Sequence, residues 1–381
     1  MPYTIPFAVM KHTQCMPGER IAMEKKELGV AVVGSGRIGT LRANMASRHP
    51  SVRFLAISDK DPDRADLLAE SVAANLASGD NYEVISRPEV NAVIVSTPEH
   101  DHVEAILQAL ELGKPVFVEK PLALTLEDAD RIVEAVERTG VELRVGYSRR
   151  HDRRWMLAKE QIVQGRLGPI LGITSRVYNT RAQMLQILKR SPHATPVMDV
   201  LTYYVDMACW YLEGIPPVEV VARSNGKIFK ALGHEAEDVT WAIVTFANGA
   251  VVNLGIFYAL PAKYPTYGQS ARFEILGEEG VILLDMDNKD SVLFTDNGVP
   301  HAYVPDHTVN MLFMQSNSSG DWALGEFWGP IANETRSWLD HLATGIPSAH
   351  TTAMEGRRTV EVTLAIDEAA KTGKAIALSG K

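Results

Sequence analysis

Residues 28–39, LGVAVVGSGRIG, combine an apolar run with the glycines Gly34, Gly36 and Gly39 and predict how the first part of the chain folds. The apolar run 29–33 is typical of a buried parallel strand, and residues 38–48 have the pattern of an amphipathic helix. Gly34 permits a tight turn from strand to helix, and Gly39 lets the helix pack closely on the sheet. We therefore expect a strand, a glycine-rich turn and a helix in this order.

An acidic residue follows this strand, turn and helix at a characteristic spacing in the sequence. Asp59 ends the next apolar run, 20 residues after Gly39. Together these features are the fingerprint of a dinucleotide site, with pyrophosphate on the helix N-terminus and the carboxylate on the ribose hydroxyls. The carboxylate would repel the extra phosphate of NADP, whereas neighbouring Lys60 would attract it. We predict NAD as the cofactor, with contacts from Gly34, Gly36, Arg37, Ile38, Gly39 and Asp59.

From residue 28 to residue 150, short apolar runs alternate with longer amphipathic stretches. This alternation of predicted strands and helices is typical of a parallel sheet. We expect strands at 29–33, 54–58, 92–96, 116–119 and 143–146, and helices at 38–48, 62–77, 101–112 and 126–139. The sequence thus predicts an N-terminal arm, residues 1–27, and a Rossmann dinucleotide-binding domain, residues 28–150.

After residue 150, extended apolar runs follow one another directly. Asn248-Gly249 separates two such runs and residues 278–280 separate two more, and both are typical of hairpins. We expect strands at 170–178, 218–223, 239–246, 250–258, 272–276, 281–285 and 291–295, and helices at 154–164, 331–343 and 355–371. The predicted fold class is α/β, in which residues 151–381 form a second α/β domain with a mainly antiparallel sheet for substrate binding and oligomerisation.

The composition excludes several functions. A net charge of −9 with dispersed Lys and Arg argues against a nucleic-acid partner, and no apolar run approaches the length of a membrane span. Cys15 and Cys209 form neither a disulfide framework nor a zinc motif, and no other set has metal-ligand spacing, so we predict no metal. We expect a cytoplasmic protein that binds small molecules.

Four further motifs make the chain resemble the Gfo/Idh/MocA oxidoreductases, the family of glucose-fructose oxidoreductase, inositol dehydrogenase and dimeric dihydrodiol dehydrogenase. They are STPEHDH at 96–102, GKPVFVEKPLA at 113–123, GYSRRHD at 146–152 and MDVLTYYVDMACW at 198–210. The order Glu-Lys-Pro in the second motif is the family's signature. The resemblance spans nearly the whole chain and implies an open sheet that often forms a dimer interface. We therefore expect a homo-oligomer, either a dimer or a tetramer.

By this resemblance, Lys120 lies in the active site beside the nicotinamide and the reacting hydroxyl. Asp199, Tyr203 and Asp206 are spaced i, i+4 and i+7, which puts them on one face of a helix. Many family members carry histidine at the position of Tyr203, although glucose-fructose oxidoreductase and dihydrodiol dehydrogenase resemble this chain in using tyrosine. We predict Lys120, Tyr203 and Asp199 as catalytic, with Tyr204 as a rival for the role of Tyr203.

The residues leave two proton acceptors open. A tyrosine with a pKa of about 10 is a poor base at neutral pH, but Lys120 and the positive nicotinamide favour its phenolate. Alternatively, the cationic ring lowers the pKa of Lys120, which takes the proton while Tyr203 positions the hydroxyl. Asp199 would orient Lys120 or bind substrate hydroxyls, although its carboxylate would also raise the pKa of Lys120.

The resemblance also implies cofactor contacts from other loops, and His102 has an alternative role as a residue that simply starts a helix. The expected contacts are Thr97, Pro98, His102, Glu119, Lys120 and Arg150. The implied reaction is the oxidation of a secondary alcohol on a polyhydroxylated ring, which is a sugar, a cyclitol or a carbocyclic dihydrodiol. The alternatives are a redox-neutral NAD-dependent glycosidase and a non-catalytic NAD-binding sensor.

Overall fold

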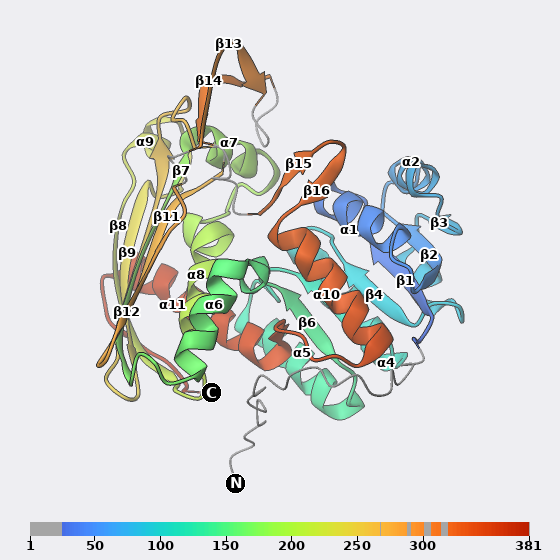
Figure 1. The fold of residues 1–381 in the computed structure, drawn as a ribbon, viewed down its shortest axis with the longest axis horizontal. Coiled ribbons are helices and arrows are strands. Elements are labelled where there is room, and N and C mark those ends of the chain that lie inside the picture. Colours follow the sequence, from blue (N-terminus) through green and yellow to red (C-terminus); the bar gives the residue numbers. More distant parts are fainter. Residues whose placement is uncertain (1–24, 267, 288–290, 301–305, 314–318, 381) are drawn as a thin grey trace, which may run out of the picture.

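The computed structural model describes residues 25–266, 268–287, 291–300, 306–313 and 319–380. Two seven-stranded sheets dominate the fold (Figure 1). The strand order is β17-β6-β5-β4-β1-β2-β3 in the first sheet and β12-β11-β7-β10-β9-β8-β18 in the second. Most of the predicted N-terminal arm, residues 1–24, lies outside the described residues.

The first sheet contains six parallel strands joined by helices. The strands are β1 (Leu28–Val33), β2 (Val52–Ser58), β3 (Leu76–Ser78), β4 (Ala92–Val95), β5 (Val116–Glu119) and β6 (Leu143–Gly146). The helices are α1 (Arg37–Ser47), α2 (Pro62–Val72), α3 (Asn81–Ser86), α4 (His102–Glu111) and α5 (Leu126–Thr139). The order reverses between β1 and β4, and open α/β sheets bind their ligands at the carboxyl ends of strands at such a point.

The predicted helix 62–77 is wrong at its C-terminal end. Helix α2 stops at Val72 because Ala73 adopts a left-handed conformation, with φ of 52°. Alanine carries no sequence signal for this conformation, which usually favours glycine. The residues beyond it form β3, and the short helix α3 follows, with the Asp80 side chain accepting a hydrogen bond from the Tyr82 amide. Neither element was predicted.

The second sheet is mainly antiparallel, as predicted. Its strands are β7 (Ile170–Thr180), β8 (Pro217–Asn225), β9 (Val239–Phe246), β10 (Val251–Leu260), β11 (Ser270–Gly277), β12 (Val281–Asp285) and β18 (Ile376–Ala377). Among the described pairings in this sheet, β7 with β10 is parallel and the others are antiparallel. The predicted fold class is therefore confirmed. Two hairpins form separate two-stranded sheets: β13 (Val292–Pro300) with β14 (Thr308–Phe313), and β15 (Asp321–Ala323) with β16 (Glu326–Trp328), which packs on α1 and α10.

Helices cover one face of this sheet (Figure 1). They include α6 (Arg153–Val163), the unpredicted α7 (Arg181–Arg190), α8 (Thr202–Tyr211) and α11 (Ala353–Thr372); the short α9 (Ile228–Ala231) lies in the loop between β8 and β9. Their apolar side chains share one core with the inward residues of the strands, such as Val252 and Phe273.

The end of the chain returns to the first sheet. Helix α10 (Pro330–Thr344) packs beside α1, and its Trp338 and Leu339 share a core with Val30 of β1. Strand β17 (Thr351–Thr352) then pairs antiparallel with β6. Segments from the end of the chain therefore pack on the first sheet, across the predicted boundary at residue 150. The assignment of separate roles to residues 28–150 and 151–381 stays a prediction.

Candidate functional site

A cavity of about 960 Å³ lies at the carboxyl ends of the first sheet and is closed on its other side by the second domain. Strand ends and following turns of the first domain supply one wall. Helix α7, the turn before α8, α8 itself and β10 supply the other. All predicted site residues except Gly39, His102 and Arg150 line this cavity.

The glycine-rich turn fits a bound dinucleotide. Gly34 has a φ of +99°, and a Cβ on Gly39 would collide with the carbonyl oxygen of Gly34, so both are required by the turn and the helix packing. A Cβ on Gly36 would meet nothing closer than the Arg64 guanidinium, at 3.6 Å. Packing alone does not demand glycine there, whereas close approach of a ligand does. Gly36 also starts α1 without a side-chain cap, which leaves N–H groups for phosphate oxygens.

Asp59 holds the same turn from the next strand. One carboxylate oxygen accepts a hydrogen bond from the Ser35 amide at 2.7 Å, and the other accepts one from the Asp61 amide at 3.1 Å. The Arg64 guanidinium lies 3.6 Å away. The side chain is buried against the turn but still borders the cavity, where ribose hydroxyls would meet it.

Lys120 is bound to the second domain. Its Nζ donates to the carbonyl oxygen of Asp199 at 2.8 Å and lies 3.5 Å from the Asp199 carboxylate, which also accepts from the Tyr258 hydroxyl at 2.8 Å. Burial disfavours the ammonium and is the largest single influence, but attraction to Asp199, together with smaller contributions from Tyr203 and Glu99, exceeds it, so the pKa of Lys120 is raised above its ordinary value. Lys120 is thus held in its charged form.

Two cations lie close to the Tyr203 ring. The Lys120 Nζ is 5.3 Å from the ring centroid, and the Arg149 guanidinium is 4.8 Å from it. Burial raises the pKa of Tyr203, and both cations oppose this by favouring the phenolate. Tyr204, the rival, is fully buried, donates to Gln269 at 3.0 Å and does not line the cavity.

The prediction that Asp199, Tyr203 and Asp206 share one face is wrong for Asp206. Asp199 lies in a π-helical turn, Val197–Leu201, that precedes α8, and the wider turn changes the helical register. Asp206 is fully buried and accepts two hydrogen bonds from Arg150, at 2.8 and 2.9 Å. Only Asp199 and Tyr203 reach the cavity.

The structure does not bring Arg150 or His102 to the cavity. Arg150 contacts Asp206 and, at 3.0 Å, Glu355, so it links α8 to the start of α11. The His102 ring is fully buried, with Nδ1 3.0 Å from the Pro121 carbonyl and Nε2 3.2 Å from the Thr97 carbonyl. Burial lowers the pKa of His102, and the neutral ring can donate to one of these two carbonyls while it packs between the loops that border the cavity.

Two family models match the chain. The one described as "Oxidoreductase family, NAD-binding Rossmann fold" matches residues 28–147, and "GFO/IDH/MocA C-terminal domain" matches residues 155–283. Together they cover more than half of the sequence. The chain belongs to the Gfo/Idh/MocA oxidoreductases. The predicted family, enzyme class and NAD-binding domain are thereby confirmed.

Individual relatives agree with this assignment. The myo-inositol 2-dehydrogenase of Thermotoga maritima is 31% identical over 279 residues, which are 70% of this chain and 78% of the relative. The scyllo-inositol 2-dehydrogenase (NAD(+)) of Bacillus subtilis is 29% identical over 281 residues, 72% of this chain and 79% of the relative. The structure of Lactobacillus casei scyllo-inositol dehydrogenase with NAD(H) and scyllo-inositol has a TM-score of 0.75 at 19% identity, covering 92% of this chain and 99% of that chain, which shows a shared fold.

Behind the signature motif of this family member lies a buried network that sequence reasoning missed. The Arg42 guanidinium of α1 is fully buried and contacts Glu119 at 2.6 Å and Glu334 of α10 at 2.7 Å. Two carboxylates share one guanidinium, and burial raises the pKa of Glu334 to about 8. Since Glu334 is 292 residues away from Arg42 in the sequence, no local sequence pattern indicates this contact.

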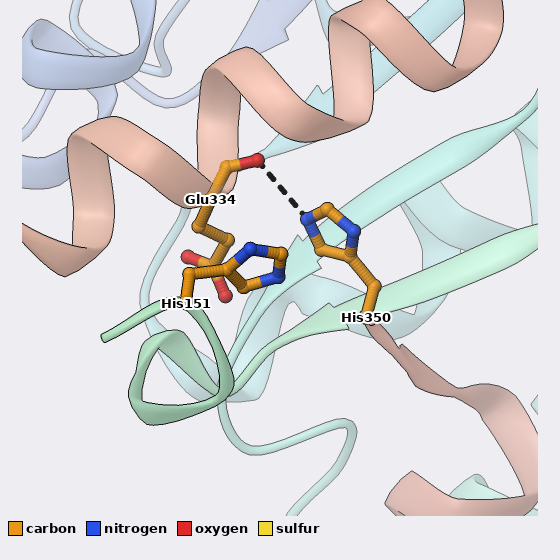
Figure 2. A group of neighbouring side chains, drawn as sticks. All are labelled: His151, Glu334 and His350. Carbon is orange, nitrogen blue, oxygen red and sulfur yellow. Dashed lines mark hydrogen bonds between the residues drawn. The ribbon is translucent and has the colours of Figure 1, made fainter. Parts of the chain in front are cut away.

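Next to this network, His151, Glu334 and His350 approach one another (Figure 2). Within the described ranges, this is the one group whose donor atoms, all within 4.8 Å, are close enough for a metal. However, His350 Nε2 lies 3.1 Å from the Glu334 carbonyl, its Nδ1 contacts the Ser348 hydroxyl, and Arg42 occupies one Glu334 oxygen. A dication would be repelled by the buried guanidinium. We therefore propose that these three residues do not bind a metal.

Proposed function

We propose that this enzyme oxidises a secondary alcohol on a polyhydroxylated ring, using NAD. The observation that carries the proposal is that Lys120, Asp199 and Tyr203 border the same cavity as the glycine-rich turn and Asp59. Proton-transfer groups and a dinucleotide cradle are thus within one ligand-sized space, as hydride transfer from an alcohol requires. A non-catalytic sensor would not need these groups.

The described residues fit the cofactor. We propose that the N-terminus of α1 and Gly36 hold the pyrophosphate and that Asp59 binds the adenosine ribose. Thr97, Pro98 and Glu119 border the cavity farther along the strand ends, towards Lys120. When bound there, NAD supplies an acceptor for the hydride of the reacting carbon.

For the proton, we propose Tyr203 as the acceptor. Asp199 holds Lys120 as an ammonium, so Lys120 has no free electron pair for a proton. That ammonium and Arg149 lie close to the Tyr203 ring and favour its phenolate, which offsets part of the rise in the pKa of Tyr203 that burial causes. In this assignment Lys120 donates a hydrogen bond to the substrate oxygen, and Asp199 orients Lys120.

The second-domain wall supports a polyol. Asn179, Gln183 and Gln186 border the cavity, and each amide offers both donors and an acceptor to hydroxyl groups. The inositol dehydrogenases among the relatives favour a cyclitol-like ring over a dihydrodiol. A redox-neutral glycosidase needs an additional acid and base for elimination, whereas Asp199 is the only carboxylate on the described part of this wall.

The test is a panel of cyclitols, sugars and dihydrodiols assayed with NAD. We expect one NADH for each substrate molecule consumed, with NAD required in stoichiometric amounts. The opposite result is cleavage of an aryl glycoside with catalytic NAD and no lasting rise in NADH absorbance. That outcome would replace the dehydrogenase with the glycosidase.

Two further proposals concern the setting of the protein. Along the described ranges, no helix is both long and apolar enough to cross a lipid bilayer. We propose the cytoplasm as its location, because Cys209 is a free buried thiol, as is usual in reducing compartments. We also propose a homo-oligomer formed through the uncovered face of the second sheet.

A further inference from the structure

One wall of the cavity carries a positive charge that the proposed reaction does not use. Helix α7 presents Gln183, Gln186, Ile187 and Arg190 to the cavity, a spacing of i, i+3, i+4 and i+7 that puts them on one helix face. Arg190 is exposed at the end of this helix, and none of the described residues forms an ion pair or hydrogen bond with it. A guanidinium that borders a ligand cavity without a partner is available to a ligand.

The other charges on this wall are already balanced. Among its described residues, Asp199 is the only other fully charged side chain, and it is paired with Lys120 at 3.5 Å. Arg190 is close enough to act on the same centre: burial and Asp199 dominate the pKa of Lys120, and repulsion from Arg190 contributes a smaller effect in the lowering direction. On this wall, Arg190 is therefore the one described charged side chain without a partner, while the Glu99 carboxylate of the first domain also borders the cavity and acts on Lys120.

We propose that the substrate ring bears a carboxylate and that Arg190 binds it. This inference rests on the proposed function and names its substrate class as polyhydroxylated acids. A carboxylate accepts two parallel hydrogen bonds from a guanidinium, and none of the described residues competes for those of Arg190. The Gln186 amide, one turn earlier on the same face, can bind the neighbouring hydroxyl while Lys120 and Tyr203 contact the reacting carbon's oxygen.

The test compares pairs of substrates that differ only in the acidic group, such as glucose with glucuronate and galactose with galacturonate, with NAD as the acceptor. We expect the wild-type kcat/KM to be at least about tenfold higher for the acid of each pair, mainly through KM. Arg190→Gln should lose at least about tenfold for the acid and much less for the neutral sugar, and Arg190→Lys should recover part of the loss. The matched control is Lys189→Gln, an exposed neighbour that does not border the cavity, which should behave as wild type.

Three outcomes would overturn the inference while leaving the dehydrogenase intact. The first is a wild-type preference for the neutral members or for glucose 6-phosphate. The second is an equal loss for acid and neutral sugars in Arg190→Gln. The third is that Arg190→Gln binds NAD more weakly, measured by fluorescence titration, by a factor that accounts for its whole loss of kcat/KM. Arg190 would then bind the cofactor and not the substrate. If no panel member is oxidised, the proposed function fails, and calorimetry with the NAD-saturated protein decides the inference: tighter binding of the acids supports it and equal binding overturns it.

Discussion

Asp59 has two roles that one substitution can separate. Its carboxylate accepts hydrogen bonds from the amides of Ser35 and Asp61, which shapes the turn, and it borders the cavity where the adenosine ribose is proposed to bind. The first role affects any dinucleotide equally. The second distinguishes NAD from NADP, because a carboxylate accepts from a ribose hydroxyl and repels a phosphate.

We predict that the wild type prefers NAD. In Asp59→Ser, kcat/KM for NAD divided by kcat/KM for NADP should be lower by at least about tenfold. Affinity for both cofactors should fall together by a smaller factor, since the turn loses a carboxylate. Steady-state kinetics with both cofactors measure this. Asp63→Ser, at an exposed position of α2 that does not border the cavity, is the control. Equal or better use of NADP by the wild type would contradict the prediction.

Lys120 and Tyr203 can be tested by removing one functional group at a time. We predict that Lys120→Ala and Tyr203→Phe each lower kcat by at least about 10²-fold, the scale of a lost proton-transfer or orienting group, while NAD affinity changes far less. Tyr204→Phe removes a buried hydroxyl that bonds Gln269, so it should keep turnover and lose about 1 kcal/mol of stability. Single-turnover kinetics and urea unfolding separate these effects. A fully active Tyr203→Phe beside an inactive Tyr204→Phe would move the role by one position.

Elements with local signals were predictable from the sequence. The turn between β1 and α1 depends on glycines whose roles follow from chain geometry, and the motif containing Lys120 was recognisable as a block. By contrast, α2 ends at an alanine in a left-handed conformation, and α7 follows β7 without a break that separates them. Arg150 was assigned to the cofactor from the family resemblance, and no local pattern indicated its partner, Asp206, which lies 56 residues later.

Helix α10 is attached to α1 and β5 through Arg42, which sequence patterns do not reveal. Glu119 and Glu334 share this guanidinium, and burial raises the pKa of Glu334 to about 8, so Glu334 is protonated at lower pH in the folded protein. In the unfolded chain, a glutamate ionises near its ordinary pKa of about 4.3. The folded state therefore binds more protons between these values, and stability from this group is lost as pH rises from about 4.5 to about 8.

Glu334→Gln should remove this pH dependence, because the amide resembles the protonated acid. We predict that the two proteins have similar free energies of unfolding near pH 4.5 and that the variant becomes relatively more stable as pH rises, by up to about 1.4 kcal/mol per pH unit, until about pH 8. Urea unfolding across this range measures the difference. Glu137→Gln, at an exposed position of α5, should track the wild type. A constant difference between wild type and Glu334→Gln at all pH values would refute the assignment.

At the scale of the whole molecule, the second sheet is covered on one face only (Figure 1). Its helices pack on the inner face, and the outer face exposes Trp241, Ile243, Val251, Leu276, Val281 and Leu283. The paired positions Trp241 and Gly255 show that this face is specifically shaped, because a Cβ on Gly255 would collide with the indole ring. Exposed apolar residues gathered on one uncovered sheet face are typical of a protein interface.

A second copy of the chain is the proposed partner for this face, since an uncovered sheet face with exposed apolar residues can pair with itself about a twofold axis. We predict that the purified protein is a dimer or tetramer at micromolar concentration, and that Leu283→Lys shifts it to smaller species by placing a charge in the interface. Leu67→Lys is the matched control, because Leu67 on α2 and Leu283 on β12 are each 67% exposed. Light scattering after size-exclusion chromatography measures both. If the wild type is a monomer, or if Leu67→Lys dissociates it as strongly as Leu283→Lys does, the uncovered sheet is not the subunit interface and the assembly must be formed by another surface.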